Sequence, residues 1–549
     1  MAAKRVLIVS GDDNGRPGSC AEAAAELLRR SGRYRPTVVG SLEAVTKRLT
    51  NCDALILHSA PSGPMPEEAE AALMRFVKSG KALVGIHAAA GTLAPGGGPS
   101  DLFGCRPGRK LTCGELLVRV VDAEHQATRR LGDFPADDVL LELADLAGSA
   151  KVLAVADWLG APLPVMFART VGRGRVFCTA LGGGTRAFAN ACFGRSLLHG
   201  LDWACRIKEA AGPIRCGLLG YGGAFGMGKI HGEQINATPG LATVAACDTD
   251  PARTRQAKID FPKCKTYPSL EAMLKDKSVD LVVNILPHNL HAETTLKCLR
   301  AGKHVVSEKP FCLTVKEADA MIRAARRSRR MLTVYHNRRW DGDYLTIQRI
   351  LAEGTIGDVF EIDCGFSRYG RPRGWWRSDK QISGGNLYDW GAHFVDWVLG
   401  LIPEKIVSVN GFFQKKVWMH VTNEDHTQAI VRFANGAKAD ITISSLSAVP
   451  RPRWRILGTA GGIVDDGSTP KAFKVFTYAR GQMVTRIVPF GPSAHHEFYW
   501  NVADHLLLGD ELEVTARQAR RAIGIIEYAE RSSRSGRGEI FPGEAGGSS

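Results

Sequence analysis

Short apolar runs of strand length alternate with longer segments of mixed polarity along the first 335 residues of the chain. Between residues 6 and 91, the apolar runs VLIVS, ALILHSA and ALVGIHAAAG are separated by segments of helical length at Ala21–Arg30 and Pro66–Ser79. The runs VLAVADW, PVMFART and RVFCTAL follow. This alternation predicts a parallel α/β sheet of flavodoxin-like type within a first domain, residues 1–207.

A second alternating series starts at Ile214 and contains a glycine-rich turn. The apolar run from Ile214 leads into the turn GLLGYGGAFG, which is followed by a helical segment (Met227–Ala237) and a second apolar run (Leu241–Cys247). This is the order of a strand–turn–helix–strand unit that holds a dinucleotide. With the later runs DLVVNILP, HVVSEKP and MLTVYHN, it predicts a Rossmann domain over residues 213–336.

The residues of the turn suit a pyrophosphate. Gly220 permits a tight bend, and Gly222 and Gly223 let backbone N–H groups come close to the phosphates. The N-terminus of the next helix then faces the negative charge. Asp248 closes the second strand, where an acidic side chain accepts the ribose hydroxyls and favours NAD over NADP. Phe225 stands where the third glycine of G-x-G-x-x-G would be.

From Asn337 onward the pattern changes to short alternating segments such as VFEIDCGFS, TQAIVRFANG and KADITISSL. They predict a largely antiparallel sheet over residues 337–540, covered by a helix after Gly385 and a pair of helices within Glu497–Arg534. The expected fold class is therefore α/β for the first two domains and α+β for the third.

Composition narrows the function classes. A length of 549 residues suits about three folding units. The 13 cysteines form no C-x-x-C pair, which predicts a reducing, cytoplasmic setting with no disulfide framework and no structural metal. No apolar stretch reaches the length of a membrane span. The net charge of +15 is dispersed, so we expect it to attract an anionic cofactor or substrate rather than nucleic acid.

Three islands of polar residues carry candidate chemistry. Glu308-Lys309-Pro310 sits at the end of a predicted strand, where open α/β sheets bind ligands. HNRRW (residues 336–340) begins the third domain, and GGNLYDWGAHFVD (residues 384–396) contains Asp389 and His393. On a helix, a spacing of four residues places these two side chains on one face.

These pieces closely resemble the Gfo/Idh/MocA oxidoreductases, which include glucose–fructose oxidoreductase and inositol dehydrogenase. The matching motifs are GYGGAFGMGKIH, ACDTDP, NILPHNLH, SEKP and DWGAHFVDW. The resemblance covers about 330 residues, from Pro213 to the C-terminus. Two departures adjoin the cofactor: the turn is two residues longer before His231, and Leu286-Pro287 replaces the frequent Thr-Pro.

The resemblance implies roles for individual residues. Lys309 would stabilise the alkoxide that develops on the substrate, His393 would accept the hydroxyl proton, and Asp389 would bind another hydroxyl and tune the Lys–His pair. The expected cofactor-binding residues are Gly220, Gly222, Gly223, Ala224, Phe225, Asp248, Leu286, Pro287, His291, Glu308, Lys309 and Asn337. The expected substrate-binding residues are Arg338, Arg339, Trp340, Trp375, Trp376, Asn386 and Tyr388, while Asp396 is expected to brace its helix.

The first domain resembles the ThuA-like (trehalose-utilisation) domains through GIHAA around His87, the later His125-Gln126, Asp137–Asp138, GRGRVFCTALG and LLHGLDWA. Related class I amidotransferases carry a cysteine nucleophile at a G-x-C-x-G elbow. His87 occupies that position here, so amidotransferase chemistry is not expected. His87 and His125 form the candidate polar site. A histidine that this family usually carries in the loop after the elbow is absent from DLFGCRPGRK.

The combined expectation is an NAD-dependent oxidoreductase, with NADP as the alternative cofactor, that acts on a secondary hydroxyl of a sugar or cyclitol. The ThuA-like domain would either process a keto-sugar or be a degenerate, non-catalytic domain. One alternative is an enzyme that retains NAD and uses transient oxidation for epimerisation, elimination or glycoside cleavage. Another is a non-catalytic NAD-binding sensor. The family resemblance also implies a homodimer or homotetramer.

Overall fold

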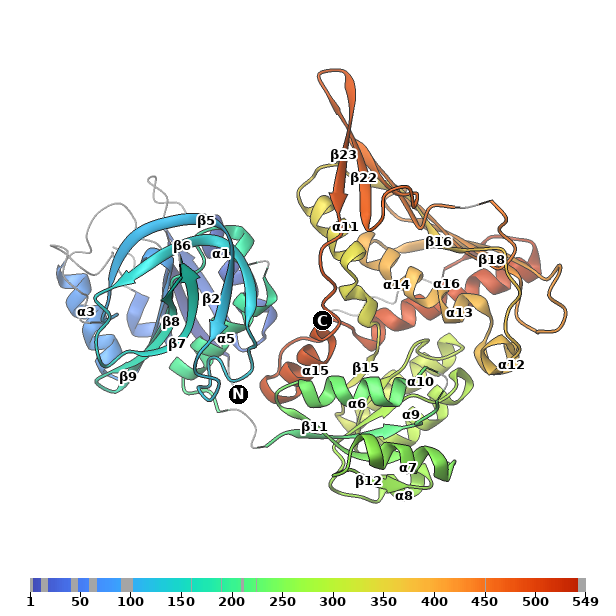
Figure 1. Ribbon diagram of the computed structural model, residues 1–549, viewed down its shortest axis with the longest axis horizontal. Coiled ribbons are helices and arrows are strands. Elements are labelled where there is room, and N and C mark those ends of the chain that lie inside the picture. The colour runs from blue at the N-terminus through green and yellow to red at the C-terminus, as the bar shows by residue number, and fades with distance from the viewer. Residues whose placement is uncertain are drawn as a thin grey trace. The chain divides into compact units, whose positions relative to one another are not determined.

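A computed structural model describes residues 3–541 except 11–17, 41–47, 59–66, 90–101, 159, 189, 209–211, 224 and 450. Most of the segment between the first two predicted domains, and the residues from 542 onward, therefore lie outside the described residues. The chain divides into two compact units (Figure 1). The first comprises residues 1–212 and 504–511, and the second comprises residues 213–503 and 512–549.

The first unit contains a nine-stranded sheet in the order β2-β1-β3-β4-β9-β8-β7-β5-β6. Its first five strands are parallel, and β8, β7, β5 and β6 continue the sheet antiparallel to their neighbours. The strands are β1 (Lys4–Val9), β2 (Tyr34–Val39), β3 (Ala54–His58), β4 (Ala82–Ile86), β5 (Arg106–Val120), β6 (Phe134–Ala144), β7 (Lys151–Trp158), β8 (Ala161–Val171) and β9 (Gly174–Thr179). The helices are α1 (Ser19–Arg30), η1 (Leu49–Asn51), α3 (Glu67–Lys78), α4 (Thr185–Phe188) and α5 (Ala191–Ala204).

The parallel half confirms the α/β pattern, but the prediction of a parallel sheet throughout this domain is wrong for β5–β8. Two residues join β7 to β8, and two join β8 to β9. Connections that short close only antiparallel hairpins, because a parallel pair needs a crossover of a dozen or more residues. The apolar runs VLAVADW and PVMFART are therefore consecutive hairpin strands.

The second unit begins with a six-stranded parallel sheet in the order β12-β11-β10-β13-β14-β15. This is the doubly wound dinucleotide-binding order, in which the chain reverses between β10 and β13. The strands are β10 (Ile214–Leu219), β11 (Leu241–Cys247), β12 (Lys265–Tyr267), β13 (Leu281–Asn284), β14 (His304–Ser307) and β15 (Leu332–Val334). The helices are α6 (Met227–Ala237), α7 (Pro251–Asp260), α8 (Leu270–Leu274), η4 (His288–Leu290), α9 (His291–Arg300) and α10 (Val315–Ser328).

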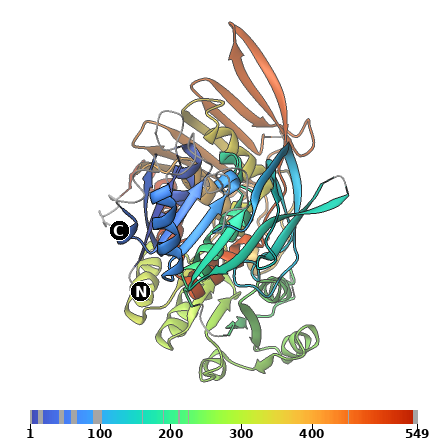
Figure 2. The ribbon, with the colours of Figure 1, turned by 90° about the vertical axis from the view of Figure 1, so that its left-hand side faces the viewer.

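A second nine-stranded sheet follows in the order β23-β22-β21-β20-β16-β19-β18-β17-β24, and only the pair β16–β19 is parallel. The strands are β16 (Val359–Ser367), β17 (Ile406–Gln414), β18 (His426–Phe433), β19 (Lys438–Ser444), β20 (Trp454–Gly458), β21 (Gly461–Asp465), β22 (Ala472–Ala479), β23 (Gln482–Pro489) and β24 (Glu539–Ile540). The β22–β23 hairpin, orange in both views, projects past the other strands of its sheet (Figure 1, Figure 2).

Helices α14 and α16 pack against this sheet, as the sequence predicts, whereas α15, the other helix of the predicted pair, does not pack against it to a comparable extent. The helices of the region are η5 (Asn337–Trp340), α11 (Gly342–Ala352), η6 (Trp376–Ser378), α12 (Lys380–Ser383), α13 (Asn386–Asp389), α14 (Gly391–Leu401), α15 (Glu497–Leu508) and α16 (Ala516–Ser535). Thr515 and Gln518 form a capping box that starts α16. No helix among the described residues is long and apolar enough to cross a membrane.

Candidate active site

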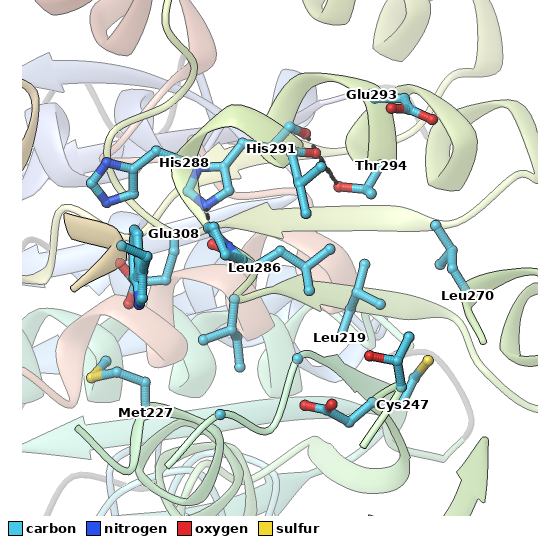
Figure 3. A pocket seen from close by; sticks show the side chains of 18 of the residues that line it. Leu219, Met227, Cys247, Leu270, Leu286, His288, His291, Glu293, Thr294 and Glu308 are labelled. Carbon is cyan, nitrogen blue, oxygen red and sulfur yellow. Dashed lines mark hydrogen bonds between the residues drawn. The ribbon is translucent and has the colours of Figure 1, made fainter. Parts of the chain in front are cut away.

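A cavity of about 610 Å³ lies where the carboxyl ends of β10, β11 and β13 meet. Cys247 and Leu270 line one end of it, and His288 and Glu308 line the other (Figure 3). Open parallel sheets bind ligands at this edge, at the point where the strand order reverses. The elongated cavity is therefore the candidate dinucleotide site.

The glycine turn borders this cavity. Gly220 has φ +92°, and a Cβ there would lie 3.1 Å from Leu286 Cδ2. A Cβ on Gly223 would lie 2.4 Å from Nη1 of Arg253, whereas Gly222 faces open space. Only glycine suits the backbone angle and close contact at Gly220. Ala224, an expected cofactor-binding residue, lies outside the described residues.

Asp248 lines the cavity and also holds the turn in place. Its Oδ2 accepts a hydrogen bond from Tyr221 N at 2.7 Å, and its Oδ1 accepts one from Asp250 N at 2.9 Å. Each carboxylate oxygen can accept a further hydrogen bond. An uncapped helix N-terminus at α6, an open Gly222 and this carboxylate fit the phosphate and ribose groups of a dinucleotide.

A second cavity of about 660 Å³ adjoins the first. The two cavities share Phe225, Met227, Glu308, Lys309 and Arg377 as lining residues. The second is also lined by Asn337, Arg338, Trp375, Asn386, Asp389 and His393, all of which the sequence predicts as site residues. It has the size and the mixed polar and aromatic lining of a small-molecule pocket.

Lys309 sits at the boundary of the two cavities and is paired with Asp389. Its Nζ donates to Asp389 Oδ1 at 2.7 Å, and Nη1 of Arg377 donates to the same oxygen at 2.7 Å. Burial raises the pKa of Asp389, but the charges of Lys309 and Arg377 outweigh burial and hold it well below its usual range. Asp389 is therefore an anion that positions two cations.

His393 lies in the second cavity as a buried, neutral imidazole. It is 5% exposed, and its Nδ1 has no hydrogen-bond partner. Burial, followed by the charges of Lys309 and His336, lowers the pKa of His393 well below its ordinary value. A neutral imidazole with a free nitrogen is a competent proton acceptor.

Glu308 is held by a buried hydrogen-bond chain. Nε2 of His231 lies 3.0 Å from Glu308 Oε1, and Nδ1 of His231 lies 2.7 Å from the hydroxyl of Tyr499. Glu308 Oε2 accepts from Lys309 N at 2.9 Å. Burial alone would raise the pKa of Glu308, but the contacts with His231 and Lys309 outweigh burial and lower the pKa to about 2. This chain fixes the backbone from which Lys309 extends.

The structure does not bring every expected residue to these cavities. Arg339 forms a bidentate ion pair with Asp396, and with Trp340 it lines a separate cavity. The hydroxyl of Tyr388 donates to Leu313 O at 2.7 Å. Trp376 lines the first cavity rather than the second.

The expected cofactor-binding residues Leu286, Pro287 and His291 also line the first cavity, and Asn337 lines the second. Arg377 and His288 were not predicted from the sequence. Arg377 directly follows Trp375-Trp376, and this proximity is the only sequence signal that could have indicated it.

The first unit has a separate polar cluster at the carboxyl ends of its parallel strands. His87 follows β4 at a backbone φ of 54°, and its Nε2 is buried without a partner. A Cβ on Gly183 would lie 2.8 Å from that nitrogen and 3.3 Å from Asp138 Oδ1. His58 bonds Ser10 Oγ at 3.2 Å and Gly182 O at 2.8 Å.

The structure does not bring His125 to this cluster. Its ring lies 4.8 Å from that of Trp203, at the C-terminal end of α5. The cluster lies near the other end of this helix: Phe193, close to the helix N-terminus, contacts Phe188, and the ring centres of Phe188 and His58 are 6.3 Å apart. Ten residues of helix separate the two ends by about 15 Å. Among the described residues, no group of three or more His, Cys, Asp or Glu side chains is placed to hold a metal ion.

Comparisons with known proteins place the chain in a family. Residues 214–336 match the oxidoreductase family with an NAD-binding Rossmann fold, residues 344–464 match the GFO/IDH/MocA C-terminal domain, and residues 5–204 match the trehalose-utilisation domain ThuA. Over 351 residues the chain is 32% identical to scyllo-inositol 2-dehydrogenase (NADP(+)) IolW of Bacillus subtilis, spanning 60% of this chain and 96% of that enzyme.

An oxidoreductase of Schizosaccharomyces pombe is 33% identical over 47% of this chain and 72% of its own length. The solved structure of the oxidoreductase yvaA from Bacillus subtilis superposes with a TM-score of 0.56 at 27% identity, covering 61% of this chain and all of that one. The chain therefore belongs to the GFO/IDH/MocA oxidoreductase family, with an NAD-binding Rossmann fold and a ThuA domain before it.

Proposed function

We propose that the second unit catalyses reversible hydride transfer between the nicotinamide of NAD(P) and a secondary hydroxyl of a sugar or cyclitol. The observation that carries this proposal is the position of Lys309, which lines both cavities and is paired with Asp389. Support for the substrate class comes from the 32% identical relative, which is named as a scyllo-inositol 2-dehydrogenase.

NAD(P), when bound, supplies the hydride acceptor, and the residues of this chain handle the proton and the charge. An alcohol is too weak an acid to ionise without a positioned base and a nearby cation. The third N–H of the Lys309 ammonium is available to the substrate oxygen, because two point at Asp389. The free nitrogen of His393 takes the hydroxyl proton. Trp375 and Asn386 line the same cavity and border the ring of the substrate.

A panel of sugars and cyclitols that includes scyllo-inositol, read at the NADH absorbance with NAD⁺ and NADP⁺ in parallel, tests this proposal. We expect turnover with at least one cyclic polyol. Turnover confined to acyclic alcohols, or none across the panel, would contradict the proposed substrate class.

A second candidate is an enzyme that keeps its cofactor between turnovers. It is favoured by a cluster over the boundary of the cavities: the rings of Phe225 and Trp375 are 5.2 Å apart, and the Arg377 guanidinium lies 4.6 Å from the centre of Phe225. We infer that these contacts slow the release of a bound cofactor. Mass spectrometry of the denatured, freshly purified protein distinguishes the candidates, since stoichiometric NAD(P) identifies retention and a cofactor-free protein excludes it.

For the first unit, we propose that His87 and Asp138 line a ligand site that takes a keto-sugar. Support comes from the buried, unpartnered Nε2 of His87 and from Asp138, a residue that is 3% exposed. Burial raises the pKa of Asp138, and it outweighs the backbone hydrogen bonds from residues 182–184, which act in the opposite direction. Isolated residues 1–207 should show no glutaminase activity, and release of ammonia from glutamine would overturn that expectation.

A further inference from the structure

His288 has an unusual combination of burial and incomplete hydrogen bonding. It lies shortly after β13, next to Pro287, and is 2% exposed. Its Nδ1 lies 2.8 Å from the carbonyl oxygen of Ser383. A carbonyl oxygen only accepts hydrogen bonds, so Nδ1 carries the proton in this contact.

The other ring nitrogen of His288 is therefore a bare acceptor. Burial is the main cause that lowers the pKa of His288, to about 3, although Asp389 acts in the opposite direction. The imidazole is neutral at neutral pH, and Nε2 then has a lone pair and no proton. It is buried and has no partner. A buried polar atom left in this state costs free energy unless a ligand supplies the missing donor.

The location of His288 restricts that donor. It lines the dinucleotide cavity together with Lys309 and Trp376, but it is absent from the lining of the second cavity. Figure 3 shows it beside Glu308, at the opposite end from Cys247 and Leu270. Asp248 and the ribose it is expected to bind lie near Cys247, so the nicotinamide belongs at the His288 end.

We propose that Nε2 of His288 accepts a hydrogen bond from the carboxamide –NH₂ of the nicotinamide and so selects the face of the ring that is turned toward Lys309. This inference rests on the proposed hydride-transfer function. The pyridinium ring itself has no N–H donor, so the carboxamide and the hydroxyls of the adjoining ribose are the donors at this end, and only the carboxamide donor differs between NAD⁺ and the analogue used below. A substrate hydroxyl would instead enter from the second cavity, which His288 does not line.

The test compares the binding of NAD⁺ with that of 3-acetylpyridine adenine dinucleotide, in which a methyl group replaces the carboxamide –NH₂. Titration calorimetry on the full-length protein gives both dissociation constants without turnover. We expect the wild-type protein to bind NAD⁺ about 10-fold more tightly than the analogue, which is the usual effect of one unsatisfied buried acceptor. In His288→Leu this preference should fall to about 1-fold, mainly through weaker NAD⁺ binding.

Two further variants sharpen the result. His288→Gln keeps an N–H donor and a C=O acceptor, and it should retain part of the preference. Asp248→Asn, at the other end of the cavity, should weaken both dinucleotides by the same factor and leave their ratio unchanged. Equal affinity of the wild-type protein for NAD⁺ and the analogue overturns the proposal whether or not the variants fold. So does a His288→Leu variant that keeps the full preference. Failure of the wild-type protein to bind NAD⁺, NADP⁺ and the analogue alike would overturn the proposed function as well.

Discussion

At the scale of single residues, Asp248 and Arg253 pull cofactor choice in opposite directions. The carboxylate of Asp248 repels a 2′-phosphate, whereas the guanidinium of Arg253 lies against Gly223 and would attract one. Asp248 belongs to the cavity lining and Arg253 does not. We therefore expect NAD⁺ to bind more tightly than NADP⁺ in calorimetric titrations, and Asp248→Ala to lower NAD⁺ affinity.

Arg253→Ala is the matched variant for this prediction. It should weaken NADP⁺ binding more than NAD⁺ binding, because it removes the cation beside Gly223 that would attract the extra phosphate. Tighter binding of NADP⁺ by the wild-type protein would contradict the assignment of Asp248, and it would agree with the cofactor of the Bacillus subtilis relative.

Lys309 and His393 are expected to dominate turnover. Lys309→Ala removes the cation at the reacting oxygen, and His393→Ala removes the proton acceptor. Each should lower kcat by about 10²–10⁴-fold, the range for a positioned proton-transfer group, and leave NAD⁺ affinity within a few fold. The control is His420→Ala, an exposed histidine outside both cavities. Near-normal kcat in both active-site variants would remove them from the mechanism.

Buried neutral histidines predict a pH-dependent stability. Burial lowers the pKa values of His288, His336 and His393 in the folded chain. The unfolded chain therefore binds protons near pH 6.5 that the folded chain does not, so the free energy of unfolding falls as pH drops below about 6.5. Each such group contributes up to about 1.4 kcal/mol per pH unit, and carboxylates add to the slope only below about pH 5.

Urea-unfolding midpoints measured from pH 8 to pH 5.5 check this prediction. The midpoint should be steady above pH 7 and fall below it. His336→Gln should flatten the fall, and the exposed His420→Gln should not. A midpoint that is unchanged at pH 5.5 would show that these histidines are accessible to protons in the folded state.

The candidate site was predictable to the extent that its residues belong to local motifs. Lys309, Asp389 and His393 each lie within a short recognisable sequence, and the structure places all three around one cavity. Arg339 and Trp340 adjoin Arg338 in sequence, yet they face a different cavity. Arg338 lines one cavity and its two successors line another, so a motif locates a segment but not the direction of each side chain.

At the scale of elements, connection length explains where the sequence-based prediction of the first domain departs from the structure. The apolar runs of β7 and β8 resemble those of β1 and β3, because a strand buried on both faces has no alternation to reveal its partner. Only the two residues between β7 and β8 distinguish a hairpin from a crossover. The shortness of that connection predicts the β7–β8 hairpin, but not the pairing of β5 with β6 and β7.

The contact between Phe225 and Trp375 could not be predicted in the same way. These residues are 150 positions apart in the chain, and their rings meet only because the glycine turn and the segment before η6 border the same pair of cavities. Phe225 replaces a glycine that the dinucleotide motif leads one to expect. From the sequence this looks like a defect in the motif, and in the structure it is an aromatic contact.

At the scale of the whole molecule, exposed apolar side chains on the large antiparallel sheet predict self-association. Phe360 and Phe412 on the large antiparallel sheet are 46% and 48% exposed, and Tyr478 and Met483 on the projecting hairpin are 71% and 61% exposed. Exposed apolar side chains in such number mark an interface more often than a solvated surface. We expect a homodimer or homotetramer through this face.

Light scattering at micromolar concentration measures the assembly directly. A mass that is a multiple of 59.4 kDa is expected, and the double variant Tyr478→Glu/Met483→Glu should shift it toward the monomer. The matched control is Val449→Glu, which is 77% exposed on a loop. A wild-type monomer of 59.4 kDa would contradict the prediction.

The division into two units predicts how the chain behaves when it is cut. The glycine turn, Asp248, Lys309 and His393 all belong to the second unit, so a chain that begins at Glu209 should bind NAD⁺ with the affinity of the full-length protein and retain its dehydrogenase activity. Residues 504–511 group with the first unit, and in the shortened chain they lack the rest of that unit. We therefore expect a lower melting temperature, measured by differential scanning calorimetry, without loss of NAD⁺ affinity. If the shortened chain is soluble and binds NAD⁺ but turns over no substrate of the full-length enzyme, the first unit contributes to the active site. Catalysis would then depend on both units, and the second unit would not be an independent enzyme.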